Sequence, residues 1–271
     1  MKCYDIKIKP KGKPEHVEIV SICCAHFGHK ACDRKRLMQW RDWVLESPNR
    51  YVYNLGDDME NALPGDEKHN SMMWDSDKTP EDQYLEAADY WKPVAEAGKL
   101  IITHDSNHAW RTEAKTGRSV AKELNVFLQG LTAKKPTSAP VPDGSPRWGR
   151  WQALTRIDLG KFQYTIHSWH GSGSGCTPEA ALRKCREQER NHVADLFLMG
   201  HAHQPITWGK EFMTFSDNGM DAIAKQRWFG VTGGFLGWHD TYAERAGLSP
   251  NRRGAIVVQL GVKRWDIKIS I

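Results

Sequence analysis

Side chains of metal-binding type recur in this 271-residue chain directly after short apolar runs. The runs read as β-strands, and His, Asp or Asn follows each of them within a few residues. In an open α/β sheet the carboxyl ends of the strands share one edge, where ligand sites form. A single histidine at a strand end is usually a surface or core residue. Five strand ends that are all followed by metal-binding side chains indicate a common site. The runs with their polar residues are 17–24 with His26, 51–55 with Asp57, 100–103 with Asn107 and His108, 162–167 with His170, and 195–199 with His201 and His203.

Helical segments alternate with these strands. Residues 33–46 place Leu37, Trp40 and Val44 on one face at helical spacing. Residues 80–98 follow Thr79 as a helix N-cap, with Pro80 in the first position and a glycine at the end. Strands that alternate with helices predict an α/β fold. The other expected elements are helices at 117–130 and 178–193 and a terminal hairpin of 255–260 with 265–271.

Length and composition limit the organisation of the chain. A hydrophobic fraction of 39% over 271 residues suffices for one sizeable core, so we expect a single domain over residues 1–271. Two polar stretches, at about 62–79 and 132–149, are expected to be loop insertions, either functional or idle. The start of the chain is polar, the six Cys form no C-x-x-C pair, and no apolar run is long enough to span a membrane. These features predict a cytoplasmic protein without a membrane span and without a Cys23–Cys24 disulfide.

The ordered motifs resemble the signature of the calcineurin-like metallophosphoesterases. That signature reads D-x-H, GD, GNH, HG and G-H-x-H, and the resemblance runs from about residue 17 to residue 203. It implies two facing mixed β-sheets in a sandwich flanked by helices. The segments that carry it are Cys24-Ala25-His26, Gly56-Asp57-Asp58, Asn107-His108, His170-Gly171 and Gly200-His201-Ala202-His203.

The resemblance also implies two divalent metal ions and a set of residues that hold them. Asp57 would ligate both ions, because a carboxylate has two oxygens. His108 would face the phosphate and donate a proton to the leaving oxygen, and Arg111 would help to clamp the phosphate. Nitrogen-rich ligation favours Mn, Fe, Zn or Ni over Mg. The first ion would be held by Cys24, His26, Asp57 and His203, and the second by Asp57, Asn107, His170 and His201.

Several positions leave alternatives open. Cys24 stands where the family has Asp, so it either ligates as a thiolate, which favours Zn, or is a small buried residue. Ser106 stands where the family has Gly, which would restrict the backbone if a positive φ were needed there. His167 is an alternative to His170 as a ligand. The Gly-Ser repeat at 171–175 either wraps a phosphate with backbone N–H groups or is a flexible linker.

The expected function is hydrolysis of a phosphomonoester or phosphodiester at a dinuclear centre. Nucleic-acid or nucleotide esters are compatible with the excess of five positive charges, which does not demand them. One rival is a phosphatase for small molecules or proteins, and another is a metal-binding scaffold without catalysis. The sequence does not determine the oligomeric state. Basic and aromatic residues that could bind along a single nucleic-acid strand are Lys134, Lys135, Arg147, Trp148, Arg150 and Trp151.

Overall fold

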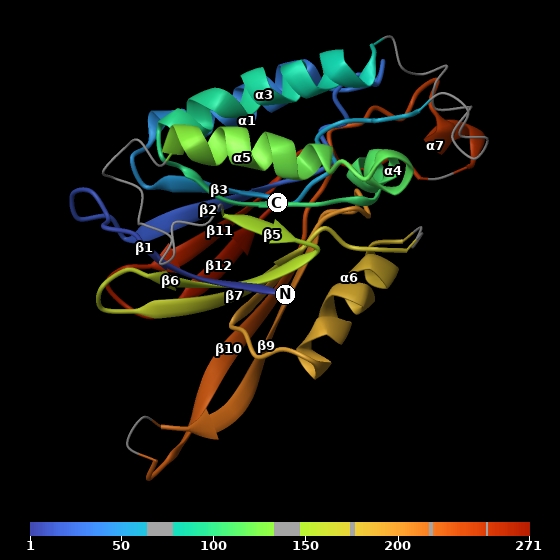
Figure 1. Ribbon diagram of the computed structural model, residues 1–271. Helices are drawn as coiled ribbons and strands as arrows, with labels where there is room; N and C mark the ends of the chain where they lie inside the picture. Colours follow the sequence, from blue (N-terminus) through green and yellow to red (C-terminus); the bar gives the residue numbers. More distant parts are fainter. Residues whose placement is uncertain (64–77, 133–146, 174–176, 217–218, 248) are drawn as a thin grey trace.

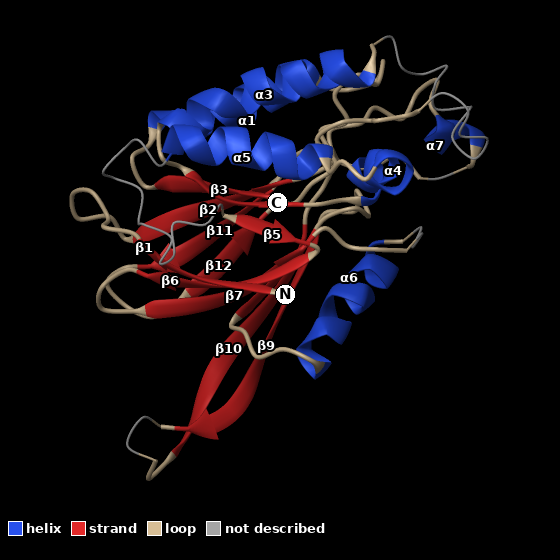
Figure 2. Ribbon diagram, in the orientation of Figure 1, coloured by secondary structure: helices blue, strands red, loops and turns tan. Residues whose placement is uncertain are grey.

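The computed structural model describes residues 1–63, 78–132, 147–173, 177–216, 219–247 and 249–271. Within these ranges the chain forms two mixed β-sheets of six strands each, with helices on their outer faces (Figures 1 and 2). The α/β class that the sequence predicts and the pair of mixed sheets that the resemblance implies are therefore confirmed. In the same part of the chain no helix has the length and apolar character needed to cross a membrane.

The first sheet contains both parallel and antiparallel pairs. Its strand order is β1 (Lys2–Lys7), β6 (Gln152–Asp158), β7 (Gln163–Trp169), β8 (Leu196–Met199), β10 (Ala222–Val231) and β9 (Ile206–Phe215). The outer part of the β9–β10 hairpin projects from the body of the molecule (Figure 1). Helix α6 (Pro178–Arg186) and a 3₁₀ turn (Glu187–Arg190) pack beside this sheet.

The second sheet has three parallel pairs that run to one edge and an antiparallel hairpin at the other edge. Its strand order is β12 (Ile267–Ser270), β11 (Ile256–Gly261), β2 (His16–Ile22), β3 (Arg50–Asn54), β4 (Leu100–His104) and β5 (Trp148–Arg150). Helices α1 (Arg34–Glu46), α3 (Pro80–Glu96) and α5 (Val120–Thr132) cover its outer face. Helices α4 (Asn107–Thr116) and α7 (Tyr242–Arg245) lie beyond the strand ends on one side (Figure 1).

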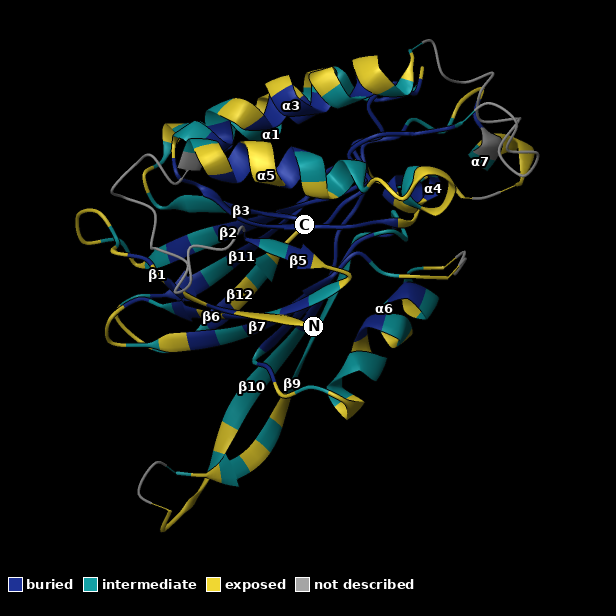
Figure 3. Ribbon diagram, viewed as in Figure 1, coloured by how far each residue is buried: buried dark blue, intermediate teal, exposed yellow. Residues whose placement is uncertain are grey.

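Strand β2 shows why its sequence reads as a continuous apolar run. Val17 and Ile19 belong to the core between the two sheets, whereas Val20 and Ile22 belong to the core beneath the helices. A strand that is buried on both faces has no polar face to alternate with its apolar one. Figure 3 shows the same burial across the central strands. This rigid sandwich holds the loops that leave the strand ends.

Element boundaries depart from the sequence prediction in ways that matter for the site. Strand β2 ends at Ile22, so Cys23 and Cys24 lie in the following turn and not in the strand. The helix expected at 117–130 starts at Val120, and α4 precedes it. Helix α4 was missed because its sequence is polar; Ser106 caps it by accepting a hydrogen bond from the backbone of Ala109. The helix expected at 178–193 ends at Arg186.

Other strands were not anticipated, and the second insertion was placed too widely. The missed strands are β1, β5, β6 and the β9–β10 hairpin. Helix α5 continues to Thr132 and β5 begins at Trp148, so both ends of the expected insertion at 132–149 belong to regular elements. The other expected insertion spans 62–79; residues 64–77 of it, and residues 133–146, lie outside the described ranges.

His167 is a core residue and not a partner of the predicted site. Its side chain is fully buried on β7, stacked on His192 at a centroid distance of 4.5 Å. Neither ring nitrogen has a hydrogen-bond partner within the described residues. Burial, with the nearby His192 and His104, lowers the pKa of His167 to about 3. His167 therefore stays neutral in the folded chain at pH values where an exposed imidazole is protonated.

This depressed pKa predicts acid sensitivity of the fold. The unfolded chain binds a proton at His167 below about pH 6.5, whereas the folded chain does so only near its own lower pKa. Stability should therefore be full above pH 6.5 and decline as the pH falls, by up to about 3 kcal/mol from this group at pH 4. Urea unfolding across this range should show a smaller loss in His167→Phe than in the wild type. Equal losses in the two proteins would contradict the assignment.

Candidate metal centre

The predicted ligands meet where the carboxyl ends of two strand groups face each other. Strands β2, β3 and β4 run parallel in one sheet, and β7 and β8 run parallel in the other. Backbone hydrogen bonds tie the loops that leave them: Cys24 N donates to Gly56 O at 2.9 Å, and Gly200 N donates to His170 O at 3.0 Å. The sandwich thereby brings all seven predicted metal residues to one rim.

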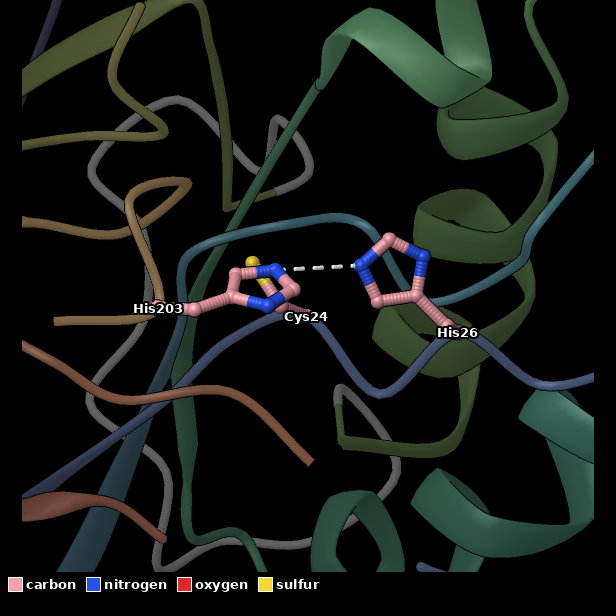
Figure 4. Close-up of side chains that lie close together, drawn as sticks. All are labelled: Cys24, His26 and His203. Atoms are coloured by element: carbon pink, nitrogen blue, oxygen red, sulfur yellow. Dashed lines mark hydrogen bonds between the residues drawn. The ribbon is translucent and has the colours of Figure 1, made fainter. Parts of the chain in front are cut away.

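One group of potential ligands consists of Cys24, His26 and His203 (Figure 4). One ligand atom from each lies within 4.8 Å of the others. The Nε2 atoms of His26 and His203 face each other at 3.3 Å. Two nitrogens at about 2.0–2.1 Å from one tetrahedral ion lie about 3.3 Å apart, so these rings fit a common ion.

A second group consists of Asp57, His170 and His201. Nε2 of His170 lies 3.1 Å from Oδ2 of Asp57 and 2.9 Å from Oδ1 of Asn107. Asn107 is the first residue of α4, and so the helix start delivers its amide oxygen to the group. A carboxylate, an amide oxygen and imidazole nitrogens are a donor set that transition metals accept. These groups can hold metal ions.

In each of three histidines, the ring nitrogen that points away from these groups makes a hydrogen bond that fixes how the ring faces them. Nδ1 of His26 donates to Oε2 of Glu60 at 2.8 Å, and Nδ1 of His170 donates to the Leu55 carbonyl at 2.7 Å. Nε2 of His201 donates to the Gly173 carbonyl at 2.8 Å. In each ring the other nitrogen is left to act as a ligand, as at most metal-binding histidines.

Glu60 is a site residue that sequence reasoning missed. It is almost fully buried and forms a third group with His26 and His108. Burial opposes its ionisation, but the charges of His108 and His26 and the hydrogen bond from His26 lower its pKa to about 2. A carboxylate three residues after Asp57, in the loop that follows the same apolar strand, was the available signal.

His108 and Arg111 lie together on the first turns of α4. Nδ1 of His108 donates to the Glu60 carbonyl at 2.7 Å, and its Nε2 accepts from Nη2 of Arg111 at 3.2 Å. Nε2 of His108 also lies 3.9 Å from Oδ2 of Asp57. Burial, only partly offset by Asp57 and Glu60, lowers the pKa of His108 to about 4. The structure thus places a neutral imidazole and a guanidinium beside the second group.

Asp57 carries the charge that organises the histidines. Burial disfavours its ionised form, yet His108, His170 and His26 hold its pKa well below the ordinary value. Burial likewise lowers the pKa of His203, to about 3, which leaves that imidazole neutral. A neutral imidazole and an ionised carboxylate are the forms that bind metals.

Unusual backbone geometry is concentrated in these residues. Positive φ is rare outside glycine and costs of order 1–3 kcal/mol unless the surroundings impose it. Gly56, whose own φ is 95°, directly precedes Asp57. A side chain at Gly56 would be crowded by Ser106 and His170. Such clustering is typical of functional sites. The potential ligands with positive φ are Cys24 (55°), His26 (51°), Asp57 (54°), His201 (63°) and His203 (53°).

Two neighbouring cysteines occupy different places. Both are free and fully buried, and their Sγ atoms lie 3.2 Å apart. Cys24 belongs to the group of His26 and His203, whereas Cys23 lies 3.6 Å from Nδ1 of His170, which already donates to a carbonyl. Burial raises the pKa of Cys24, so a thiolate there requires a cation beside it.

The structure also decides several other sequence expectations for residues near the rim. Ser106 has φ −144°, so this position does not need glycine. Asp105 accepts from the Trp148 indole and does not orient His108. Arg147 is only 4% exposed, so the expected basic track does not extend through it. Residues 174 and 175 of the Gly-Ser repeat, like Lys134 and Lys135, lie outside the described residues.

Comparison with known proteins adds little to this geometry. The sequence matches no protein-family profile and no curated protein. Among solved structures, the chain is similar to the hypothetical protein PH1004 from Pyrococcus horikoshii OT3. The match has 11% sequence identity and a TM-score of 0.41 and covers 93% of this chain and 86% of that one. Similarity at this level carries no argument about function.

The two cysteines provide a matched test of the first group. Cobalt-substituted protein should show a sulfur-to-metal charge-transfer band that is lost in Cys24→Ser and retained in Cys23→Ser. The reason is that only Cys24 shares a group with His26 and His203. A Zn–S distance of about 2.3 Å in an X-ray absorption measurement would establish the bond directly. A band that survives in Cys24→Ser would show that this thiol is a packing residue.

Proposed function

We propose that this chain is a metal-dependent phosphoesterase of the calcineurin-like type, with two divalent ions held around Asp57. The observation that carries the proposal is the position of this carboxylate. It contacts His170 in the second group, and the charge of His26 in the first group helps to lower its pKa. A carboxylate shared between two groups of imidazoles is suited to hold a pair of cations, because its charge offsets their repulsion.

The donor set indicates how the ions would be held. The first would be ligated by Cys24, His26, Asp57 and His203, and the second by Asp57, Asn107, His170 and His201. When bound, such ions polarise phosphate oxygens and lower the pKa of water to give a nucleophile. A thiolate in the first set favours Zn there over Mg.

His108 and Arg111 supply the functions that the ligands do not. Arg111 donates to Nε2 of His108, and a phosphate that takes up this guanidinium frees that nitrogen. The anionic phosphate beside it then raises the pKa of the buried imidazole, so His108 can gain a proton. It can pass this proton to the leaving oxygen, while Glu60 holds the ring through Nδ1.

Asp57→Asn should reduce metal-dependent hydrolysis of bis-p-nitrophenyl phosphate to background. The amide lacks the charge that offsets two cations, so bound metal should fall as well. Both are measurable, the first by absorbance and the second by elemental analysis, with the exposed Asp89→Asn as control. Wild-type rates and metal content in Asp57→Asn would refute a shared carboxylate. Metal binding by the wild type without hydrolysis of any phosphate ester would favour the non-catalytic scaffold.

His108→Ala should lower turnover of an alkyl phosphodiester, such as a dinucleoside phosphate, by about 10²-fold or more. An alkoxide is a poor leaving group and needs the proton. The loss should be much smaller with p-nitrophenolate as the leaving group, and bound metal should remain. Equal losses for both leaving groups would exclude proton donation, and loss of metal would make His108 a ligand.

A further inference from the structure

A groove of about 610 Å³ lies outside the metal centre, between α1 and the β11–β12 hairpin. Its main side chains come from segments that are far apart in the sequence. Arg36, Trp40 and Trp43 line it from α1, and Arg252 and Arg253 line it from the segment before β11. Its volume falls in the range of about 300–1,000 Å³ that is typical of ligand sites.

The groove is positively charged. Three arginines line it, and no carboxylate side chain does so among the described residues. Asp33, behind the groove, pairs with Arg253 at 2.7 Å and lies 3.5 Å from Arg36. Arg252 is exposed and has no ion-pair partner in the described part of the chain. The three guanidinium groups therefore exceed the one carboxylate side chain that reaches them.

The same groove offers aromatic surface. Trp40 and Trp43 are half-buried, with ring centroids 5.5 Å apart and planes at 86°. The guanidinium of Arg50 covers one face of Trp43 at 3.7 Å. The indole edge of Trp40 lies beside Gly254, where a Cβ would meet the indole nitrogen at 3.4 Å, an ordinary van der Waals contact. Partly exposed indole beside guanidinium is a combination that binds bases and phosphates together.

Only a short backbone segment separates this groove from the first ligand group. Gly234 packs against the ring of His203, and its carbonyl accepts from Gly254 N at 3.0 Å. Phe235 N donates to the Cys24 carbonyl at 3.0 Å. Pro205, two residues after His203, lines the groove itself. A polymer could therefore contact both the groove and the metal centre.

We propose that this groove binds single-stranded nucleic acid, with phosphates on Arg36, Arg252 and Arg253 and unpaired bases on Trp40 and Trp43. The inference rests on the proposed function for its role in hydrolysis but not for binding. In a duplex the base faces are stacked on one another and cannot reach the indoles. A mononucleotide has too few phosphates to occupy both groove and centre, and an acidic peptide has no planar bases to stack.

Binding can be tested by fluorescence anisotropy with a labelled oligothymidylate of about 15 nucleotides, in EDTA, so that no hydrolysis occurs. Arg252→Ala should weaken binding at least threefold and reduce the slope of log K against log salt by about 0.7, the value for one phosphate contact on a single strand. Trp40→Leu should weaken binding about fivefold or more through lost stacking. Arg264→Ala is the matched control, because it removes an exposed arginine from the far turn of the same hairpin.

Several outcomes would overturn the proposal. Affinities of Arg252→Ala and Arg264→Ala that match the wild type would place the strand elsewhere. Equal affinity for a duplex of the same length would exclude stacking on the indoles, and competition by a mononucleotide at the affinity of the strand would make the ligand a nucleotide. Trp40→Leu is interpreted together with its thermal unfolding midpoint, and Arg252→Ala gives the decisive result if that midpoint falls.

Failure of this inference and failure of the proposed function are distinguishable. Hydrolysis of bis-p-nitrophenyl phosphate by the wild type with Mn, without binding of oligothymidylate, would reject the groove alone. Binding of the strand in EDTA, without metal-dependent hydrolysis of any ester, would reject the phosphoesterase and keep the groove.

Discussion

A buried carboxylate surrounded by imidazoles is the interaction on which the rim of this molecule depends. Asp57 is 2% exposed, and an isolated charge so deeply buried would be costly unless it were paired. His170 and His26 supply the opposing charge, and His170 supplies a side-chain hydrogen bond, that keep Asp57 ionised. The two sheets must close for these residues to meet, because His26 and Asp57 follow strands of one sheet and His170 follows a strand of the other.

The strained backbone of the rim follows from the same requirement. Short turns after β2, β3 and β8 have to aim side chains inward over a very small distance, and positive φ achieves this. Packing of the strands against the core and the helices holds the turns in place, so the strain persists in the folded state. Gly56 and Gly200 allow the turns to approach each other, since a side chain at Gly200 would overlap the Cys23 thiol.

Glu60 joins the parts of the site that have different chemical roles. Its carboxylate orients His26, a potential ligand, and its carbonyl accepts from both His108 and Arg111. A shift of this one residue would therefore displace a potential metal ligand, His26, together with the proposed proton donor, His108. The groove beyond Gly234 adds a separate surface, whose guanidinium and indole groups suit a charged polymer more than a small ester.

The sequence by itself was sufficient for the alternation of strands and helices and for the seven potential ligands. The alternation follows from local apolar runs, and the set of ligands follows from the ordered motifs and their resemblance to the metallophosphoesterases. The sequence did not predict β1, β6 or the β9–β10 hairpin, because charged and polar residues interrupt the apolar ones in each of these strands. The motif favoured His170 over His167, but the sequence did not show where the two side chains point, because His167 ends the same run that His170 follows. Only the direction of each side chain relative to β8 and α6 placed one in the core and the other beside Asp57.

The tertiary structure also decided which residues cooperate. The sequence around Arg147 predicts that this residue is exposed. It is buried, because it directly precedes β5 and β5 pairs with β4. Trp40 and Arg252 are separated by more than two hundred positions and share a groove only because β11 pairs with β2 beneath α1. Local patterns report on one element at a time, whereas contacts between sheets and helices depend on how the whole chain packs.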